Sequence, residues 1–200
     1  MQTIREPVNF EAILARIVGA KPLGLSVLAE PRIFGGHLDF VWRSARSGLP
    51  VLMKDIILDS RQIDAAAACG ASAVLLIESL AGRGHLHGPI QALIDEAHLR
   101  NLDVVLEVHT LPEWDEAVRT DADILGINNR NLGTMEVDME TTPRILLERA
   151  KDRPVIAMSG VETRAQVKAM LNAGADAVLV GTSIMLHEDP ARKLQELEGG

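Results

Sequence analysis

The sequence predicts an α/β fold, a (β/α)₈ TIM barrel, and two observations lead to it. Short apolar runs rich in Val, Ile and Leu recur along the chain without the polar/apolar alternation of a half-exposed sheet. Amphipathic stretches separate these runs, so strands and helices alternate. The runs predict seven parallel strands buried on both faces, at 24–28, 50–54, 72–77, 103–108, 123–127, 154–158 and 176–181.

The same alternation occurs in doubly wound sheets, and three features favour the barrel. The chain contains neither a GxGxxG dinucleotide-binding turn nor a GxxxxGK[ST] P-loop. Polar residues follow several different strands at their carboxyl ends, where barrels build active sites. The last strand leads into Gly181-Thr182-Ser183 before a predicted short helix, which is a common phosphate-binding position in barrels.

The helices are predicted from amphipathic stretches between the runs. The five clearest are Phe10–Val18, Ser60–Cys69, Pro89–Arg100, Arg164–Ala173 and Pro190–Glu198. A closed barrel needs eight strands, and no strand is predicted before Gly24. We therefore expect residues 1–200 to form a single barrel domain that lacks its first strand and is incomplete at the N-terminus.

Composition excludes several other classes of protein. The 200 residues are 47% hydrophobic and 24% charged, which is typical of a folded domain and not of a disordered chain. One cysteine cannot form an internal disulfide framework or a cysteine metal cage. A net charge of −8 with 2% aromatic residues argues against a nucleic-acid partner. Neither a membrane-spanning run nor a signal peptide occurs, so we expect a cytoplasmic protein without a membrane partner.

Two charged residues stand out because they lie within apolar strands. Lys54 ends the run PVLMK, where partial loss of hydration at a barrel mouth suits an ammonium group to proton transfer. The alternative is a lysine that extends outward or pairs with Asp55. Glu107 interrupts the run VVLEV, and a buried carboxylate must be paired, protonated or functional. A structural ion pair would also explain Glu107, but a facing Lys54 would account for both residues, and we predict both to be catalytic.

Polar and glycine-containing strand ends are candidates for substrate binding. Asn128 and Arg130 follow the fifth predicted strand, and their amide and guanidinium suit a phosphate or carboxylate group. Ser159-Gly160 and Gly181-Thr182 end the last two strands, where backbone N–H groups can meet phosphate oxygens. Each of these segments could equally be an ordinary turn. The two glycine-containing ends nevertheless favour a phosphate site, because they lie on neighbouring strands.

Four other residues, three histidines and the cysteine, are discounted. His85 and His87 lie in a glycine-rich loop without a carboxylate at ligand spacing, so we predict no metal site. His109 follows the strand of Glu107 and could border a site, but the sequence shows no partner for it. Cys69 stands beside a helix-ending glycine and is expected in the core.

Most of residues 9–190 match one family in the family's order. The matching stretches are Ser26–Gly36, Pro50–Ile56, Asp64–Ile77, Leu106–His109, Gly126–Leu132, Asp138–Thr142, Ser159–Arg164 and Gly174–Met185. The most specific feature is GINNRNL followed by SG and VGTSIM, because phosphate-binding barrels in general share only the glycines. On these residues the chain resembles the indole-3-glycerol phosphate synthase family.

The resemblance implies a (β/α)₈ barrel without a metal or organic cofactor. It also implies a lyase of tryptophan biosynthesis that closes 1-(2-carboxyphenylamino)-1-deoxyribulose 5-phosphate to indole-3-glycerol phosphate with loss of carbon dioxide and water. Such an enzyme takes a phosphorylated small molecule, and the sequence leaves open an oligomer or a partner enzyme of the pathway.

The resemblance assigns a role to each matching residue. Lys54 matches the general acid that protonates the ketone oxygen, and Glu107 matches the carboxylate that assists dehydration. The remaining matches are to substrate-binding positions: Asn128 for polar groups, Phe34 beside the anthranilate ring, and Arg130, Ser159, Gly160, Gly181 and Thr182 at or near the phosphate.

The chain departs from the resemblance mainly at two places, with a milder change at Ile56, where the family usually has Phe. Family members open the barrel with a strand that contributes a Glu and a second Lys, whereas Ile4–Val8 resembles the loop after that strand. The family also has Glu before the Ser-Gly pair, where this chain has Met158, which carries no charge.

Without a first strand, the strands at Gly24 and Asp176 would each have an unpaired edge. Three explanations stay open: a true start upstream of Met1, which we favour, a strand supplied by another chain, or a decayed relative with a rearranged sheet. The corresponding functional alternative is a non-catalytic barrel that binds phosphorylated metabolites. Phosphoribosylanthranilate isomerase fits less well, because it needs a catalytic Cys at the first strand, and Cys69 lies in a predicted helix.

Overall fold

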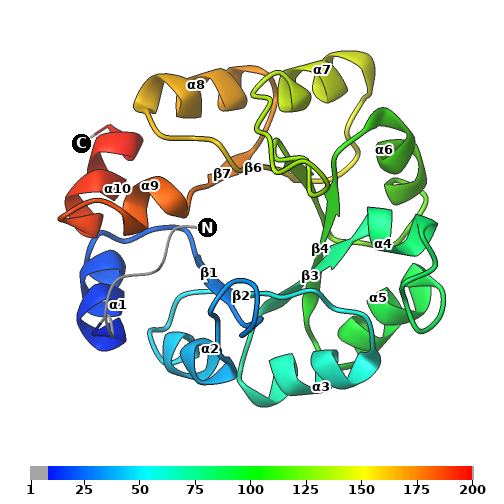
Figure 1. Ribbon diagram of the computed structural model, residues 1–200, viewed down its shortest axis with the longest axis horizontal. Helices are drawn as coiled ribbons and strands as arrows, with labels where there is room; N and C mark the ends of the chain where they lie inside the picture. The colour runs from blue at the N-terminus through cyan, green and yellow to red at the C-terminus, as the bar shows by residue number, and fades with distance from the viewer. Residues whose placement is uncertain (1–8, 200) are drawn as a thin grey trace.

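A computed structural model describes residues 9–199 and contains one sheet of seven parallel strands in the order β1 to β7, so that each strand pairs with the next along the chain (Figure 1). The strands are β1 Leu25–Leu28, β2 Val51–Lys54, β3 Ala73–Ile77, β4 Asp103–Val108, β5 Ile124–Asn128, β6 Val155–Met158 and β7 Ala177–Leu179. Every predicted strand overlaps one of them, and the predicted α/β barrel class is confirmed.

Helices form a ring around the sheet (Figure 1). They are α1 Phe10–Gly19, α2 Leu38–Ala45, α3 Ser60–Ala68, α4 Glu78–Gly82, α5 Ile90–Leu99, α6 Leu111–Ala117, α7 Thr141–Glu148, α8 Arg164–Asn172, α9 Thr182–Met185 and α10 Pro190–Glu198. Local sequence begins several of them. The Thr163 side chain accepts from the backbone N–H of Gln166, and Gln166 caps Thr163 in return, which starts α8 with a complete capping box.

The apolar residues divide into two layers. One lies between the strands and the surrounding helices and includes Val104, Leu106, Val108 and Trp114. The other fills the inside of the barrel, where Leu75, Val105 and Met158 pack together. Alternate residues of β4 therefore belong to different layers, which explains why the run is continuously apolar and why Glu107 points inward with Val105.

The ring of strands has a seam between β1 and β7. Within residues 9–199, β1 pairs only with β2 and β7 pairs only with β6. The helical layer does continue across this seam, because α1 packs against α10 and Arg16 lies 3.3 Å from Asp189 (Figure 1). The stretch 4–8, which resembles the loop after the family's first strand, lies outside the described residues.

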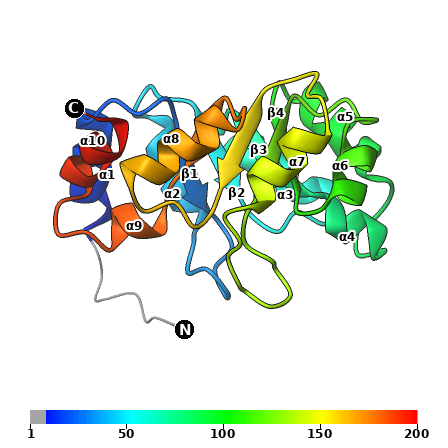
Figure 2. The same cartoon turned by 90° about the horizontal axis from the view of Figure 1, so that it is seen from above.

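The loops after the strands gather at one edge of the barrel. In Figure 2 the loops after β1 and β5 project from the same side of the molecule, which is the carboxyl end of the strands. Parallel strands place all of their carboxyl ends together, so side chains distant in sequence meet there. Across residues 9–199 none of the helices has the length and apolar character needed to cross a membrane.

Candidate active site

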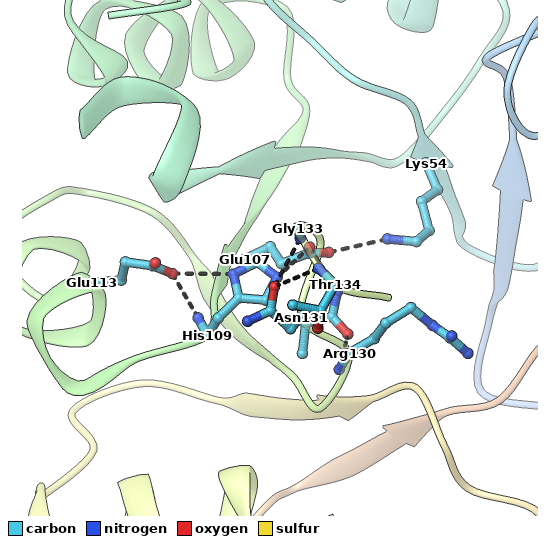
Figure 3. Close-up of polar contacts among 9 residues, drawn as sticks. Lys54, Glu107, His109, Glu113, Arg130, Asn131, Gly133 and Thr134 are labelled. Atoms are coloured by element: carbon cyan, nitrogen blue, oxygen red, sulfur yellow. Dashed lines mark hydrogen bonds and ion pairs between the residues drawn. The ribbon is translucent and has the colours of Figure 1, made fainter. Parts of the chain in front are cut away.

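Lys54 and Glu107 form an ion pair at the carboxyl end of the barrel (Figure 3). Lys54 is the last residue of β2, and its Nζ lies 3.1 Å from Oε2 of Glu107 on β4. The Glu107 side chain is 1% exposed and that of Lys54 is 27% exposed. The carboxylate of the pair is therefore buried, and the lysine side chain is its partly exposed member, near the mouth of the barrel. The facing arrangement expected from the sequence is present, and the pairing with Asp55 does not form.

The second oxygen of Glu107 is also held. Nδ2 of Asn128, at the end of β5, donates to Oε1 of Glu107 over 2.8 Å. Burial raises the pKa of Glu107, but contact with His109, the charge of Lys54 and the Asn128 hydrogen bond outweigh burial and lower the pKa to about 2. Glu107 is therefore a carboxylate at neutral pH in spite of its burial.

His109 lies between two carboxylates. Its Nδ1 is 3.1 Å from Oε2 of Glu113, and its Nε2 is 3.3 Å from Oε1 of Glu107, within ion-pair range but out of line for a hydrogen bond. The backbone N–H of His109 donates to the same Glu113 oxygen over 2.7 Å. Burial lowers the pKa of His109, but the two carboxylates outweigh burial and raise it to about 9.

The partner missed from the sequence was therefore Glu113, in the first turn of α6. Thr110 caps this helix by accepting from the backbone N–H of Glu113. The Thr-x-x-Glu spacing is a helix-start signal that could have placed Glu113 next to His109.

Asn129 fixes the end of β5 against β6 and α7. This side chain is 1% exposed. Its Nδ2 donates to the Ser159 carbonyl oxygen over 3.1 Å, and its Oδ1 accepts from the backbone N–H and the hydroxyl of Thr142. Of the two neighbouring asparagines, Asn128 thus binds Glu107, and Asn129 connects the end of β5 to β6 and α7.

Arg130 organises the loop that follows β5. Its guanidinium donates to the Met135 carbonyl oxygen over 3.0 Å, and its backbone N–H donates to Oδ1 of Asn128 over 3.0 Å. Asn131 closes the same loop by accepting from the backbone N–H groups of Gly133 and Thr134 (Figure 3). Arg130 is therefore held within the loop at the carboxyl end of β5.

Ser159 and Gly160 form a tight turn directly after β6. Both have a positive φ, +67° and +78°, which is rare for a residue with a side chain. A Cβ on Gly160 would overlap Val137 and Met139 of the neighbouring β5–α7 segment. Glycine is needed at 160 for both conformation and space.

Replacing Gly160 with Ala is expected to lower the free energy of unfolding by about 2–4 kcal/mol, through a strained φ and overlap with Val137. Urea unfolding measures the change. Gly48→Ala is the matched control, because Gly48 has φ +79° with nothing within 4 Å of an added Cβ, so it reports the cost of φ alone. Equal losses in the two variants would show that contact with the β5–α7 segment contributes nothing.

The remaining predicted binding residues lie around the same mouth. Gly181 follows β7 and is the N-cap residue of α9, which begins at Thr182, and both residues are exposed. Phe34, 36% exposed, lies in the β1–α2 loop. That loop is shaped by Glu30, whose carboxylate accepts from the backbone N–H groups of Arg32, Ile33 and Phe34.

Met158 ends β6, at the position where the resemblance leads us to expect Glu. It pairs with Asn128 in the sheet and is 1% exposed. Its thioether lies over Gly126, where an added Cβ would come within 2.5 Å of the Met158 methyl group. Met158 thus places an apolar group inside the barrel, next to residues of the strands that carry the ion pair.

Glu78 is a buried carboxylate that no pattern in the sequence predicts. It begins α4, directly after β3, and is 7% exposed. Its Oε2 has no hydrogen-bond partner within residues 9–199. Burial raises the pKa of Glu78 to about 7, and repulsion from Glu113 and Glu116 acts in the same direction.

Glu78→Gln is expected to stabilise the protein at alkaline pH. The folded state keeps a proton on Glu78 that the unfolded state releases above the ordinary pKa of 4.5, so native stability falls as the pH rises from 4.5 through about 7. Below pH 4.5 the variant should match the native protein. At pH 8 it should be more stable by about 1–3 kcal/mol.

Urea unfolding of the two proteins at pH 4.5 and pH 8 checks this. Glu148→Gln, at an exposed position on α7, is the control for the loss of one surface charge. A Glu78→Gln variant that is less stable at pH 8 than at pH 4.5, relative to the native protein, would contradict the assignment.

No group of three or more His, Cys, Asp or Glu residues that could hold a metal ion occurs within the described part of the chain. His87, in the discounted loop, instead contacts Asp59, with Nδ1 2.9 Å from Oδ2. Cys69 is partly buried and packs against the core layer.

The fold and the site define a class, a parallel (β/α)-barrel domain with a partly buried Lys–Glu pair at the carboxyl ends of its strands. The family model for indole-3-glycerol phosphate synthase matches residues 1–197. The chain belongs to the indole-3-glycerol phosphate synthase family.

Individual relatives agree with the family model. The chain is 41% identical over 184 residues to the indole-3-glycerol phosphate synthase of Albidiferax ferrireducens, covering 86% of this chain and 64% of the relative. It is 38% identical over 177 residues to that of Lactiplantibacillus plantarum, covering 88% of this chain and 66% of the relative. The chain thus spans slightly less than two thirds of the length of these relatives.

Comparison of structures supports the fold independently. The 3-hexulose-6-phosphate synthase of Salmonella typhimurium matches with a TM-score of 0.75 over 94% of this chain and 89% of that chain. At 19% sequence identity this likeness concerns the fold alone.

Proposed function

We propose that this barrel carries indole-3-glycerol phosphate synthase activity. The reaction closes 1-(2-carboxyphenylamino)-1-deoxyribulose 5-phosphate to indole-3-glycerol phosphate with loss of carbon dioxide and water, which makes the protein a lyase of tryptophan biosynthesis. The observation that carries the proposal is the Lys54–Glu107 ion pair at the carboxyl ends of β2 and β4, at the two positions that match the family's acid and carboxylate.

The geometry suits these two residues to proton transfer. Lys54 is an ammonium group held 3.1 Å from a carboxylate, so it can donate a proton to the ketone oxygen as the aromatic carbon attacks. Glu107 stays ionised at neutral pH, so it can accept a proton in the dehydration that follows. Asn128 and Lys54 occupy different oxygens of Glu107 and fix its orientation.

The phosphate is assigned to the other side of the mouth. Ser159 and Gly160 after β6 and Gly181 and Thr182 after β7 lie on neighbouring strands, and Arg130 stands at the end of β5. Backbone N–H groups of such turns and a guanidinium are suitable phosphate donors. Phe34, on the β1–α2 loop, is the aromatic group assigned to the anthranilate ring.

The proposal includes an eighth strand in the seam between β1 and β7. Both edges lack a partner within residues 9–199, and a barrel interior left open there would admit water. We propose that residues 1–200 belong to one barrel domain that this strand completes, supplied by a preceding segment or by a second chain. The active form would be cytoplasmic and would need no metal or organic cofactor.

A non-catalytic barrel that binds phosphorylated metabolites is the second candidate, favoured by Met158. An apolar side chain stands where the family has a carboxylate, while the glycine-containing ends of β6 and β7 are retained. Such a protein would bind indole-3-glycerol phosphate without forming it.

One experiment separates the two candidates. The protein is purified from its native source, and its intact mass is compared with 21.6 kDa to test for the preceding segment proposed above. Formation of indole-3-glycerol phosphate is then followed by its indole absorbance. Turnover supports the synthase. Product binding by calorimetry without turnover, also in Met158→Glu, supports the non-catalytic barrel and overturns the synthase.

A further inference from the structure

The environment of His109 indicates a role in the candidate active site, and the family resemblance assigns this residue no role. The imidazole directly follows β4, and its side chain is 11% exposed. Each ring nitrogen lies next to a different carboxylate, Nε2 to Glu107 in the barrel mouth and Nδ1 to Glu113 on α6. Figure 3 shows these side chains in one chain of contacts that ends at Lys54.

Charge balance in this cluster depends on His109. Glu107 and Glu113 face it directly, and Lys54 lies beyond Glu107. On the far side of Glu113 are Glu78 of α4, whose pKa is raised to about 7, and Glu116 of α6, which pairs with Arg119. With a neutral imidazole, Lys54 would be the only cation paired with Glu107 or Glu113 among the described residues. A protonated imidazole gives Glu113 and Glu107 a shared counter-charge.

We propose that His109 is a positioning residue that, as an imidazolium held by Glu113, keeps Glu107 ionised and oriented toward Lys54. The inference rests on the proposed synthase function, because it concerns the carboxylate of that reaction.

The need for a second cation follows from the chemistry of Lys54. When Lys54 gives its proton to the substrate, its amine becomes neutral, and Glu107 loses the charge 3.1 Å from its Oε2. Asn128 contributes a hydrogen bond but no charge. His109 then supplies the remaining positive charge next to Glu107, so the carboxylate stays ionised for the step that follows.

Fixation by Glu113 distinguishes this arrangement from a chance contact. The Glu113 oxygen that meets Nδ1 also accepts from the backbone N–H of His109 over 2.7 Å, and Glu113 itself is locked into the capped first turn of α6. The imidazole is thus held by Glu113 on the side opposite Glu107.

The first test is independent of activity. Among the six histidines, His109 is assigned in ¹⁵N-histidine NMR spectra by its loss in His109→Gln, and its titration is followed. We expect His109 to stay protonated to about pH 9, and to titrate at least one pH unit lower in Glu113→Gln and in Glu107→Gln. Titration near the ordinary value of 6.5 in the native protein would overturn the proposal; should Glu107→Gln fail to fold, Glu113→Gln decides.

The second test reads the reaction. In His109→Gln we expect kcat to fall roughly 10- to 100-fold with KM changed less than about threefold, and the acidic limb of the kcat–pH profile to move to higher pH, because Glu107 then takes up a proton more readily. His109→Lys, which restores a cation, should recover part of kcat. A native-like pH profile in His109→Gln would overturn the proposal.

His98→Gln is the matched control. His98 also pairs with a carboxylate, with Nε2 2.9 Å from Asp123 beside the amino end of β5, so its loss should leave kcat and the pH profile unchanged. If the native protein forms no product, the proposed function fails, and the NMR titration still decides whether His109 is the cation of the cluster.

Discussion

Lys54→Ala is expected to lower kcat by about 10²- to 10⁴-fold while the barrel stays folded and product still binds. The reason is that Lys54 is the ammonium held against Glu107 at the mouth, and alanine can neither carry nor donate that proton. Asn128 and His109 still contact Glu107 in the variant, so the carboxylate keeps two of its three partners and the fold should survive. Steady-state kinetics and calorimetric binding of indole-3-glycerol phosphate measure the two parts of the prediction.

Lys151→Ala is the control for this variant. Lys151 is also a lysine in an ion pair, 2.6 Å from Asp176, but it lies at the amino end of the strands, away from the mouth. Its kcat should equal that of the native protein. Native-like turnover in Lys54→Ala would refute the role of Lys54 as the acid.

Glu107→Gln is expected to lower kcat at least 100-fold and to destabilise the fold by about 3 kcal/mol. The amide keeps the shape of the side chain but removes the negative charge, so Lys54 and His109 lose their common partner inside the mouth. Kinetics report the first effect, and urea unfolding reports the second. Glu196→Gln, an exposed carboxylate paired with Arg192 on α10, is the control and should change neither.

The stability difference should also depend on pH in a defined direction. The pKa of Glu107 is lowered from its ordinary value of 4.5 to about 2, so the folded state binds fewer protons than the unfolded state between these values. The stabilisation by Glu107 is therefore present above pH 4.5 and is lost as the pH falls through 2. A gap between native protein and variant that grows as the pH falls from 4.5 to 3 would contradict this electrostatic explanation.

The strands were predictable from sequence because they are buried on both faces. Val104 to Val108 alternate between the helical layer and the barrel interior, yet both environments are apolar, and the run is broken only at Glu107. Short helices were harder to predict. Helix α4 has five residues and α6 has seven, too few to show a full amphipathic period, although Thr110 and Glu113 carry the helix-start signal of α6.

Some residues of the candidate site were likewise predictable from the sequence, and others were not. Lys54 and Glu107 were predictable because a charge at the end or in the interior of an apolar strand costs free energy unless it is paired. His109 was left without a partner because Glu113 lies on the following helix and their contact depends on how α6 turns back over β4. Glu78 follows the last residue of an apolar run and is buried by packing of α4 against α6, which no local pattern reveals.

The most direct test of the proposed site is a crystal structure of the protein with indole-3-glycerol phosphate bound. We predict the phosphate at the backbone N–H groups after β6 and β7, next to Gly160 and Gly181, and the indole end beside Phe34. Lys54 and Glu107 should lie within hydrogen-bond reach of the product. A phosphate bound anywhere else, or a product out of reach of Lys54, would contradict the assignment of this end of the barrel as the active site.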